Sequence, residues 1–332
     1  SFLGTGLVGA AAAAALVVPG AVSAPDSGDR PAPPVAGASG GPATTAAPAA
    51  RDILLAAATR AEEAPVRTGK YWHVRKELVS GPIRVGTKPD TYYVMQREVD
   101  ESWQARDAAG DSWYGRRSLG VRPRAAADEA AWRAAGSPTT WNQGPSDSAD
   151  KRDLILSTRP SRGELVKAGP DEPRGERGPL DHRWDAVRRL PTDDNELRDR
   201  ILQGIRLDAD FPAGSESENV RLFGEMTGLL LDAPAPPKVR AAAFRVLAGI
   251  PGVRSLGEAD DAAGRPGLAV EMSTRSNGIA WSYQIIVDAD THVLLGHTVS
   301  SRRGGSSVPV KEQSALVFAA EWTDAQPRIP AV

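Results

Sequence analysis

The chain has 332 residues, of which 41% are hydrophobic and 25% are charged, and it contains no cysteine. The lack of cysteine excludes a disulfide scaffold, thiol catalysis and thiolate-bound metals. A formal net charge of -2 gives no basic field that could hold a nucleic acid, so no nucleic-acid partner is expected. The 33 arginines against seven lysines are typical of a GC-rich, actinobacterial genome.

The first 24 residues predict a transmembrane segment. No charged residue precedes Asp26, and residues 2–22 as a helix would span roughly 30 Å, the thickness of the hydrocarbon core of a bilayer. A cleaved signal peptide is the alternative, because Val22-Ser23-Ala24 fits the small-residue cleavage rule. We favour a retained anchor, since the basic region of a signal peptide is missing. The sequence begins with Ser, so we expect the segment to be N-terminally incomplete.

Residues 25–50 predict a disordered linker. They hold three charged side chains and are otherwise rich in Ala, Pro and Gly, with too few large apolar groups to offset the entropy of ordering. We therefore expect residues 51–332 to form a separate extracytoplasmic domain. The protein would be located at the cell membrane as a single-pass protein, with residues 2–22 in the lipid bilayer.

The first part of this domain predicts a helix followed by short antiparallel strands. Residues 52–63 have an amphipathic helical pattern with Asp52 as the cap. Apolar and polar residues then alternate, which predicts strands at 72–78, 93–99, 103–105 and from Trp113 onward. A helix is expected at 128–135. Residues 144–190 are dense in Pro, Gly and mixed charge, and they predict a long irregular loop.

The second part predicts three helices and four strands. Helical spacing begins at Thr192 and recurs around 222–230 and 239–247, where Pro251-Gly252 ends the third helix. Period-two alternation predicts strands at 268–272, 279–287, 293–299 and 316–322. A sheet with one apolar and one polar face requires cover on a single side. The fold class is therefore α+β, with a curved antiparallel sheet and helices packed on one face.

No motif in the chain predicts a metal, a cofactor or a catalytic nucleophile. Ser148 and Lys151 match S-x-x-K, but the K-T-G that accompanies it in penicillin-recognising enzymes is absent. Asp288, Asp290 and His292 have calcium-loop spacing, but Val293 replaces the turn glycine and no Glu closes the loop. A hairpin turn explains these residues better. We therefore expect a protein that is not an enzyme.

Eight tryptophans against five Phe and five Tyr form an unusual ratio. Trp72, Trp103 and Trp113 all fall in the first predicted sheet. Core packing is the common use of indole side chains, and a ligand groove lined by these three is the alternative. Such a groove would bind an apolar component of the cell envelope.

Several blocks of the sequence resemble one family, a set of uncharacterised actinobacterial single-pass membrane proteins titled after a locus tag. The resemblance covers about residues 51–332 outside the loop at 144–190. It is carried by residues 69–73 (GKYWH), 128–138 (DEAAWRAAGSP) with Trp141, 190–193 (LPTD), 236–257 (PPKVRAAAFRVLAGIPGVRSLG), 261–270 (DAAGRPGLAV) and 321–324 (EWTD) with Pro327 and Pro330. The chain departs from the family at 288–293 (DADTHV), where the family tends to have Pro and Gly in the turn.

The resemblance implies a cytoplasmic N-terminal segment, one membrane helix and an extracytoplasmic domain, often encoded beside extracytoplasmic-function sigma factors. It implies no catalytic residues. Three functions remain open. The first is a sensory or regulatory partner of a sigma factor, which would bind the cytoplasmic segment. The second is a carrier of a hydrophobic envelope ligand in a half-barrel groove, by loose analogy with lipoprotein carriers, and the third is a hydrolase. We favour the first.

Overall fold

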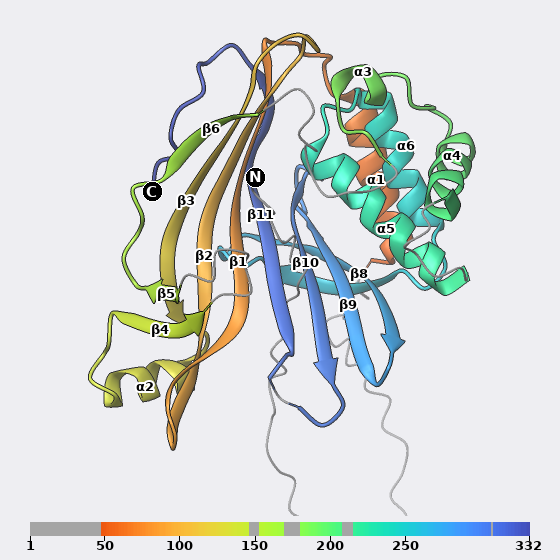
Figure 1. Ribbon diagram of the computed structural model, residues 1–332. Helices are drawn as coiled ribbons and strands as arrows, with labels where there is room; N and C mark the ends of the chain where they lie inside the picture. The colour runs from red at the N-terminus through yellow and green to blue at the C-terminus, as the bar shows by residue number, and fades with distance from the viewer. Residues whose placement is uncertain (1–47, 146–152, 169–179, 208–214, 307) are drawn as a thin grey trace, which may run out of the picture.

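The computed structural model describes residues 48–145, 153–168, 180–207, 215–306 and 308–332 (Figure 1). The predicted membrane segment at 1–24, nearly all of the linker at 25–50 and the motif at 148–151 lie outside these residues. Within the described ranges, no helix is long and apolar enough to cross a membrane.

One antiparallel sheet of nine strands organises the domain, in the order β6-β3-β2-β1-β11-β10-β9-β8-β7. Its first and last strands along the chain, β1 and β11, pair at its centre. The predicted α+β class and antiparallel sheet are thus confirmed. The strands are β1 (Tyr71–Thr87), β2 (Asp90–Ala105), β3 (Ser112–Pro123), β6 (Glu164–Ala168), β7 (Arg254–Asp260), β8 (Pro266–Ser276), β9 (Ile279–Val287), β10 (Leu294–Arg303) and β11 (Lys311–Thr323).

The helices are α1 (Ala50–Glu63), α2 (Ala126–Ala134), α3 (Trp184–Val187), α4 (Asp194–Leu207), α5 (Ser215–Asp232) and α6 (Pro237–Gly249). Residues that favour helix starts explain where two of these helices, α4 and α6, begin. The Asp193 carboxylate accepts hydrogen bonds from the backbone N–H groups of Asn195 and Glu196, which caps α4. Pro237 occupies the first turn of α6, where no backbone N–H is needed.

The main core lies between a layer of helices and one face of the sheet. α1, α4, α5 and α6 lie together beside β8–β11, and α5 contacts β8, β10 and β11 (Figure 1). Alternate residues of two strands join the helices in this core, namely Val270 and Met272 of β8 with Ile285 and Val287 of β9. We call the face that carries these four residues the inner face, and the opposite face the outer face.

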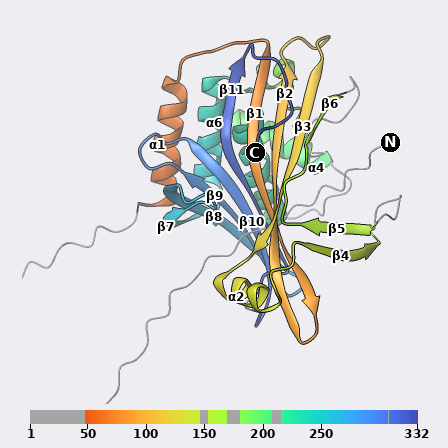
Figure 2. The same cartoon turned by 90° about the vertical axis from the view of Figure 1, so that its left-hand side faces the viewer.

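A second, smaller core lies at the end of β1, β2 and β3 that is remote from the layer of helices. There α2 contacts β2 and β3, and the hairpin of β4 (Thr140–Pro145) and β5 (Asp153–Ser157) extends sideways from the sheet (Figure 2). Tyr92, Val94, Val121 and Leu156 form this core. The Trp141 indole N–H donates to the Tyr92 hydroxyl at 3.2 Å, which anchors the hairpin.

The prediction of a long irregular loop at 144–190 differs from the structure, because this segment contains β5, β6 and α3. The signal was weak for a physical reason. In β5 Leu156 is buried while the neighbouring Leu154 and Ile155 are both exposed, so these three apolar residues do not alternate. β7 also lacked a signal, since it is an edge strand whose one buried residue is Gly257.

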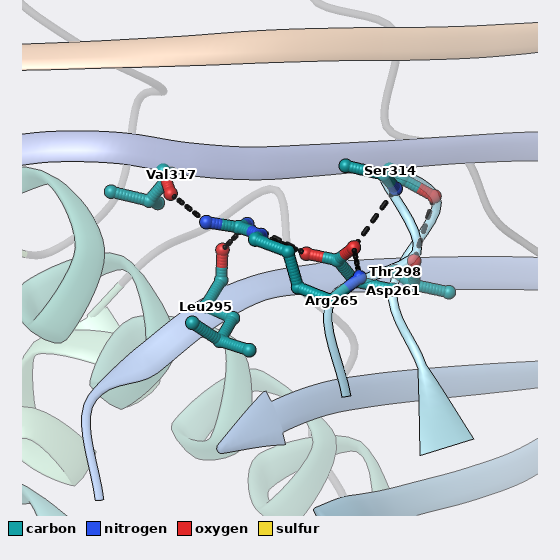
Figure 3. A network of polar contacts seen from close by, with 7 residues as sticks. Asp261, Arg265, Leu295, Thr298, Ser314 and Val317 are labelled. Carbon is teal, nitrogen blue, oxygen red and sulfur yellow. Dashed lines mark hydrogen bonds and ion pairs between the residues drawn. The ribbon is translucent and has the colours of Figure 1, made fainter. Parts of the chain in front are cut away.

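Arg265 lies in the turn between β7 and β8, and its side chain contacts β10 and β11 at a β-bulge in each strand (Figure 3). The pairing register skips Leu295 in β10 and Phe318 in β11, so each strand has a bulge there. A bulge interrupts the ladder of backbone hydrogen bonds. Arg265 donates to the carbonyl oxygens of Leu295 at 2.9 Å and Val317 at 2.8 Å, and its guanidinium lies 4.7 Å from the Phe318 ring centroid.

Asp261 holds this arginine in place from within the same turn. Its carboxylate accepts from Arg265 Nε at 2.6 Å and from the backbone N–H groups of Ala263 and Arg265. Because the planar guanidinium meets three acceptors at once, lysine cannot replace it. We name this arrangement of Asp261, Arg265 and the two carbonyl groups the Arg265 clamp.

The clamp predicts a large effect for a conservative change. Arg265→Lys should lower the free energy of unfolding by about 2–4 kcal/mol, because two carbonyl groups lose charged hydrogen bonds. Arg275→Lys, at an exposed position of β8, should change it by less than about 0.5 kcal/mol. Urea unfolding followed by circular dichroism measures both. Equal midpoints for the two variants would show that the clamp does not stabilise the fold.

Candidate functional site

Two polar contacts between the inner face and the helices end on the same residue. Lys76 of β1 donates to Asp232 Oδ1 at 2.6 Å, and the Trp72 indole N–H donates to the Asp232 carbonyl oxygen at 2.9 Å. Asp232 is the last residue of α5. The Lys76 and Asp232 side chains keep 20% and 35% of their exposure, so solvent reaches the junction between the two layers.

Strand pairing brings further titratable groups to the same face. His297 of β10 lies opposite Ile285 of β9 and Ala315 of β11. Residues directly opposite each other point to the same face of a sheet, and Ile285 lies on the inner face, so the His297 imidazole lies there too. Asp100 of β2 lies directly opposite Lys76. His182 lies against Gly228 of α5, where an added Cβ would come within 3.4 Å of its ring.

Both histidines are held in the neutral form. Burial and, to a smaller extent, the Lys76 charge lower the pKa of His297 to about 4, against the opposing effect of the Asp232 carboxylate. Burial also lowers the pKa of His182, again against Asp232. The Nδ1 atom of His297 is buried with no hydrogen-bond partner, which is costly in a folded protein.

The pKa values of the two carboxyl groups at this junction are shifted in opposite directions. Burial raises the pKa of Asp100, although Lys76 and Arg116 oppose the shift. Burial likewise disfavours ionised Asp232, but its contact with Lys76 outweighs this and lowers its pKa. We name Lys76, Asp100, His182, Asp232 and His297 the inner cluster. It combines one ion pair, two imidazoles with lowered pKa values and one carboxyl group with a raised pKa, a combination suited to holding a polar or charged group.

Three tryptophans border the inner cluster. The Trp72 and Trp322 rings meet edge to face at 5.6 Å, and Trp322 meets Trp184 in the same way at 5.3 Å. These contacts connect β1 and β11 with α3. Trp184 also lines an open surface depression with Lys70, Arg106 and Asp324.

The structure places Trp72, Trp103 and Trp113, for which a groove lining was the alternative to core packing, on two different faces of the sheet. Trp103 and Trp113 lie opposite each other on β2 and β3. Trp103 stacks on His73 with ring centroids 4.9 Å apart, and His73 adjoins Trp72 in β1. Since neighbouring residues of a strand point to opposite faces, Trp72 lies on the inner face and the other two on the outer face. Sequence periodicity describes each strand alone and contains no information on this register.

The chain's own C-terminal segment covers the outer face near Trp103. Pro330 packs so closely that a Cβ added to Gly115 would lie 2.7 Å from its ring, and Arg75 donates to the Ala331 carbonyl oxygen at 3.1 Å. The C-terminus lies beside β3 and β6 (Figure 1). As a result Trp103 is 3% exposed, and it packs with Tyr71, Ala105, Trp113 and Leu165.

A satisfied ion cluster lies under this cover. Glu101 is 4% exposed and accepts hydrogen bonds from His73 at 3.2 Å and from Arg75. Burial acts to raise its pKa, but these two bonds outweigh burial, and the pKa falls below its ordinary value. Glu101 is therefore a fixed anion that ties β1 to β2 on the outer face.

The predicted turn at 288–293 is confirmed. The Asp288 carboxylate accepts from the backbone N–H groups of Asp290 and Thr291 and from the Thr291 hydroxyl, and these bonds lower its pKa. His292 N donates to the Asp288 carbonyl oxygen, which closes the turn. Over the described ranges, no three His, Asp or Glu residues are grouped so that they could hold a metal ion.

No known protein family, curated protein or solved structure matches this chain. The candidate site therefore depends on its own geometry. Sequence reasoning missed Lys76 and Asp232, although both left a signal. Lys76 interrupts the apolar alternation of Trp72, Val74 and Leu78, and Asp232 follows the apolar run of α5 directly.

The low pKa of His297 predicts a stability that depends on pH. Between pH 6.5 and about 4 the unfolded chain binds a proton at this position and the folded chain does not, so stability falls as the pH falls. From pH 7.5 to pH 4.5 the wild type should lose about 1–3 kcal/mol more of unfolding free energy than His297→Gln. His182 is present in both proteins, so its contribution cancels in urea titrations at each pH. Parallel pH profiles would contradict the assignment.

Proposed function

We propose that the described domain is a non-enzymatic binding module of the cell envelope, anchored by residues 1–24, and that it acts as a sensory or regulatory partner of a sigma-factor system. The observation that carries the proposal is the convergence of two contacts between sheet and helices on Asp232, where solvent has access. A ligand with a charged group can compete for Lys76 or Asp232 there. Occupancy would then alter how the helices pack on the sheet.

The packing of the helices offers a physical route from this junction to the linker. α5, which ends at Asp232, contacts α6, and α6 contacts α1. Arg245 of α6 forms an ion pair with Glu62 of α1. Since α1 follows directly after residues 25–50, a shift of α5 would move the point at which the domain joins the linker. The role of a sigma factor as the partner depends on the family resemblance.

The inner face gives the carrier alternative little support. Its β2 positions are Gln96, Glu98, Asp100, Ser102 and Gln104, which are polar and not fully buried. Glu98 pairs with Arg116 at 2.8 Å. An apolar ligand would gain little from such a surface. A polar or charged ligand group fits it better, which favours a binding module that responds to such a group.

The function can be tested in the native organism through transcription that depends on an extracytoplasmic-function sigma factor, which the family resemblance leads us to expect beside the gene. Deletion should change this transcription at least threefold. Asp232→Asn and Lys76→Met should shift it in the same direction, because both remove the ion pair at the junction. Asp290→Asn and Lys88→Met, at exposed turn positions, are the matched controls and should behave as wild type.

Immunoblots must show equal amounts of each variant in the membrane fraction. If deletion leaves transcription unchanged, the regulatory function is wrong. If deletion acts but the two junction variants behave like their controls, signalling does not pass through Asp232.

A further inference from the structure

A second cavity lies away from the inner cluster, between the C-terminal end of α1, the helix α6 and the turn between β9 and β10. It has a volume of about 290 Å³. Most of its wall is apolar, formed by Ala61, Ala64, Pro65, Phe244, Val293 and Leu294. The charged residues at this cavity are Arg60, Glu63 and Arg240, and His292 also lines it.

Arg240 is the unusual member of this wall. Its Nη1 donates to the Leu230 carbonyl oxygen at 2.8 Å, and within the described chain it has no carboxylate partner. Burial alone lowers its pKa to about 10, which agrees with the lack of a neighbouring anion. Buried arginines are normally paired, because an unpaired buried cation is costly.

Arg240 lines the cavity and has N–H groups without a protein partner. Arg117 Nε, His292 Nδ1 and His297 Nδ1 are the described side-chain atoms that are fully buried without a partner, and no Arg240 atom is among them. The Arg240 nitrogens without a protein partner therefore keep some accessible surface at a residue that borders the cavity.

The opposite wall holds a residue in a conformation that favours glycine. His292 has a φ of 57°, in the left-handed region. The turn thus places an imidazole at the cavity at a backbone cost that glycine would avoid. Arg60 and Arg240 against Glu63, the one carboxylate among the residues that line the cavity, leave it with a net positive charge.

We propose that this cavity binds an aliphatic carboxylate of about eight carbons, with its carboxylate on Arg240 and its chain against Phe244 and Leu294. The planar guanidinium matches a carboxylate in shape and charge. At roughly 30 Å³ per small non-hydrogen group, the cavity holds about ten such atoms, the size of octanoate. This site is separate from the inner cluster and does not depend on the function proposed above.

Isothermal titration calorimetry with the full chain in detergent micelles tests the proposal by comparing three probes. Octanoate should bind with a Kd of about 0.1–1 mM. Octanol, which lacks the charge, and acetate, which lacks the chain, should each bind at least tenfold more weakly. Titration of octanoate into protein-free micelles measures its partition into detergent. If octanol binds as tightly as octanoate, or if octanoate shows no binding to the protein at 10 mM, the proposal is wrong.

Protein variants then identify the anchor. Arg240→Lys keeps a positive charge but loses the planar pair of donors, and it should weaken octanoate binding at least tenfold. Arg275→Lys, on the exposed part of β8, should bind like wild type. Unchanged binding by a folded Arg240→Lys would overturn the role of Arg240. If that variant unfolds, the comparison of the three probes on the wild type decides the proposal.

Discussion

The Arg265 clamp is the constraint on which the rest of the structure depends. Bulges at Leu295 and Phe318 bend two adjacent central strands, and one guanidinium satisfies a carbonyl group at each. The bulge at Phe318 directly adjoins the pair that Lys76 of β1 forms with Val317 of β11. The clamp therefore fixes both the curvature of the sheet and the position from which Lys76 reaches Asp232. Stability of the sheet and geometry of the candidate site share one cause.

The ionisable residues on the two faces of β1 and β2 differ in how completely they are hydrogen-bonded. On the outer face, Glu101 is enclosed, fully bonded to His73 and Arg75, and covered by the C-terminal segment. On the inner face, His297 lacks a partner and Asp100 has a raised pKa. A satisfied buried network rigidifies a fold, whereas ionisable groups with strongly perturbed pKa values are typical of functional sites. The contrast separates a structural cluster from a functional candidate within the same pair of strands.

The sequence predicted most helices and strands of the domain, but it did not predict how they pair and pack. The alternation at 279–287 predicted β9 correctly, because a half-buried strand must alternate, and the pattern from Val239 to Leu247 predicted α6 for the same kind of reason. Contacts between segments that are distant in the sequence determine the pairing register, the bulges and the position of Arg265 against β10 and β11. For that reason Trp72 and Trp103 looked like neighbours in a groove although they lie on opposite faces. Lys76 could have been noticed as a cation in an apolar series and Asp232 as a carboxylate directly after the apolar run of α5, but nothing in the sequence shows that the two pair.

The C-terminal segment has a consequence for handling the protein. Pro330 packs beside Gly115, and the Ala331 carbonyl oxygen accepts from Arg75, so the last residues of this sequence belong to the tertiary structure. A fusion partner or affinity tag joined directly after Val332 would compete with these contacts and draw the cover away from Trp103. The Trp103 indole would then become accessible to water. A tag at this end therefore requires a flexible spacer, so that the C-terminal segment stays packed over Trp103.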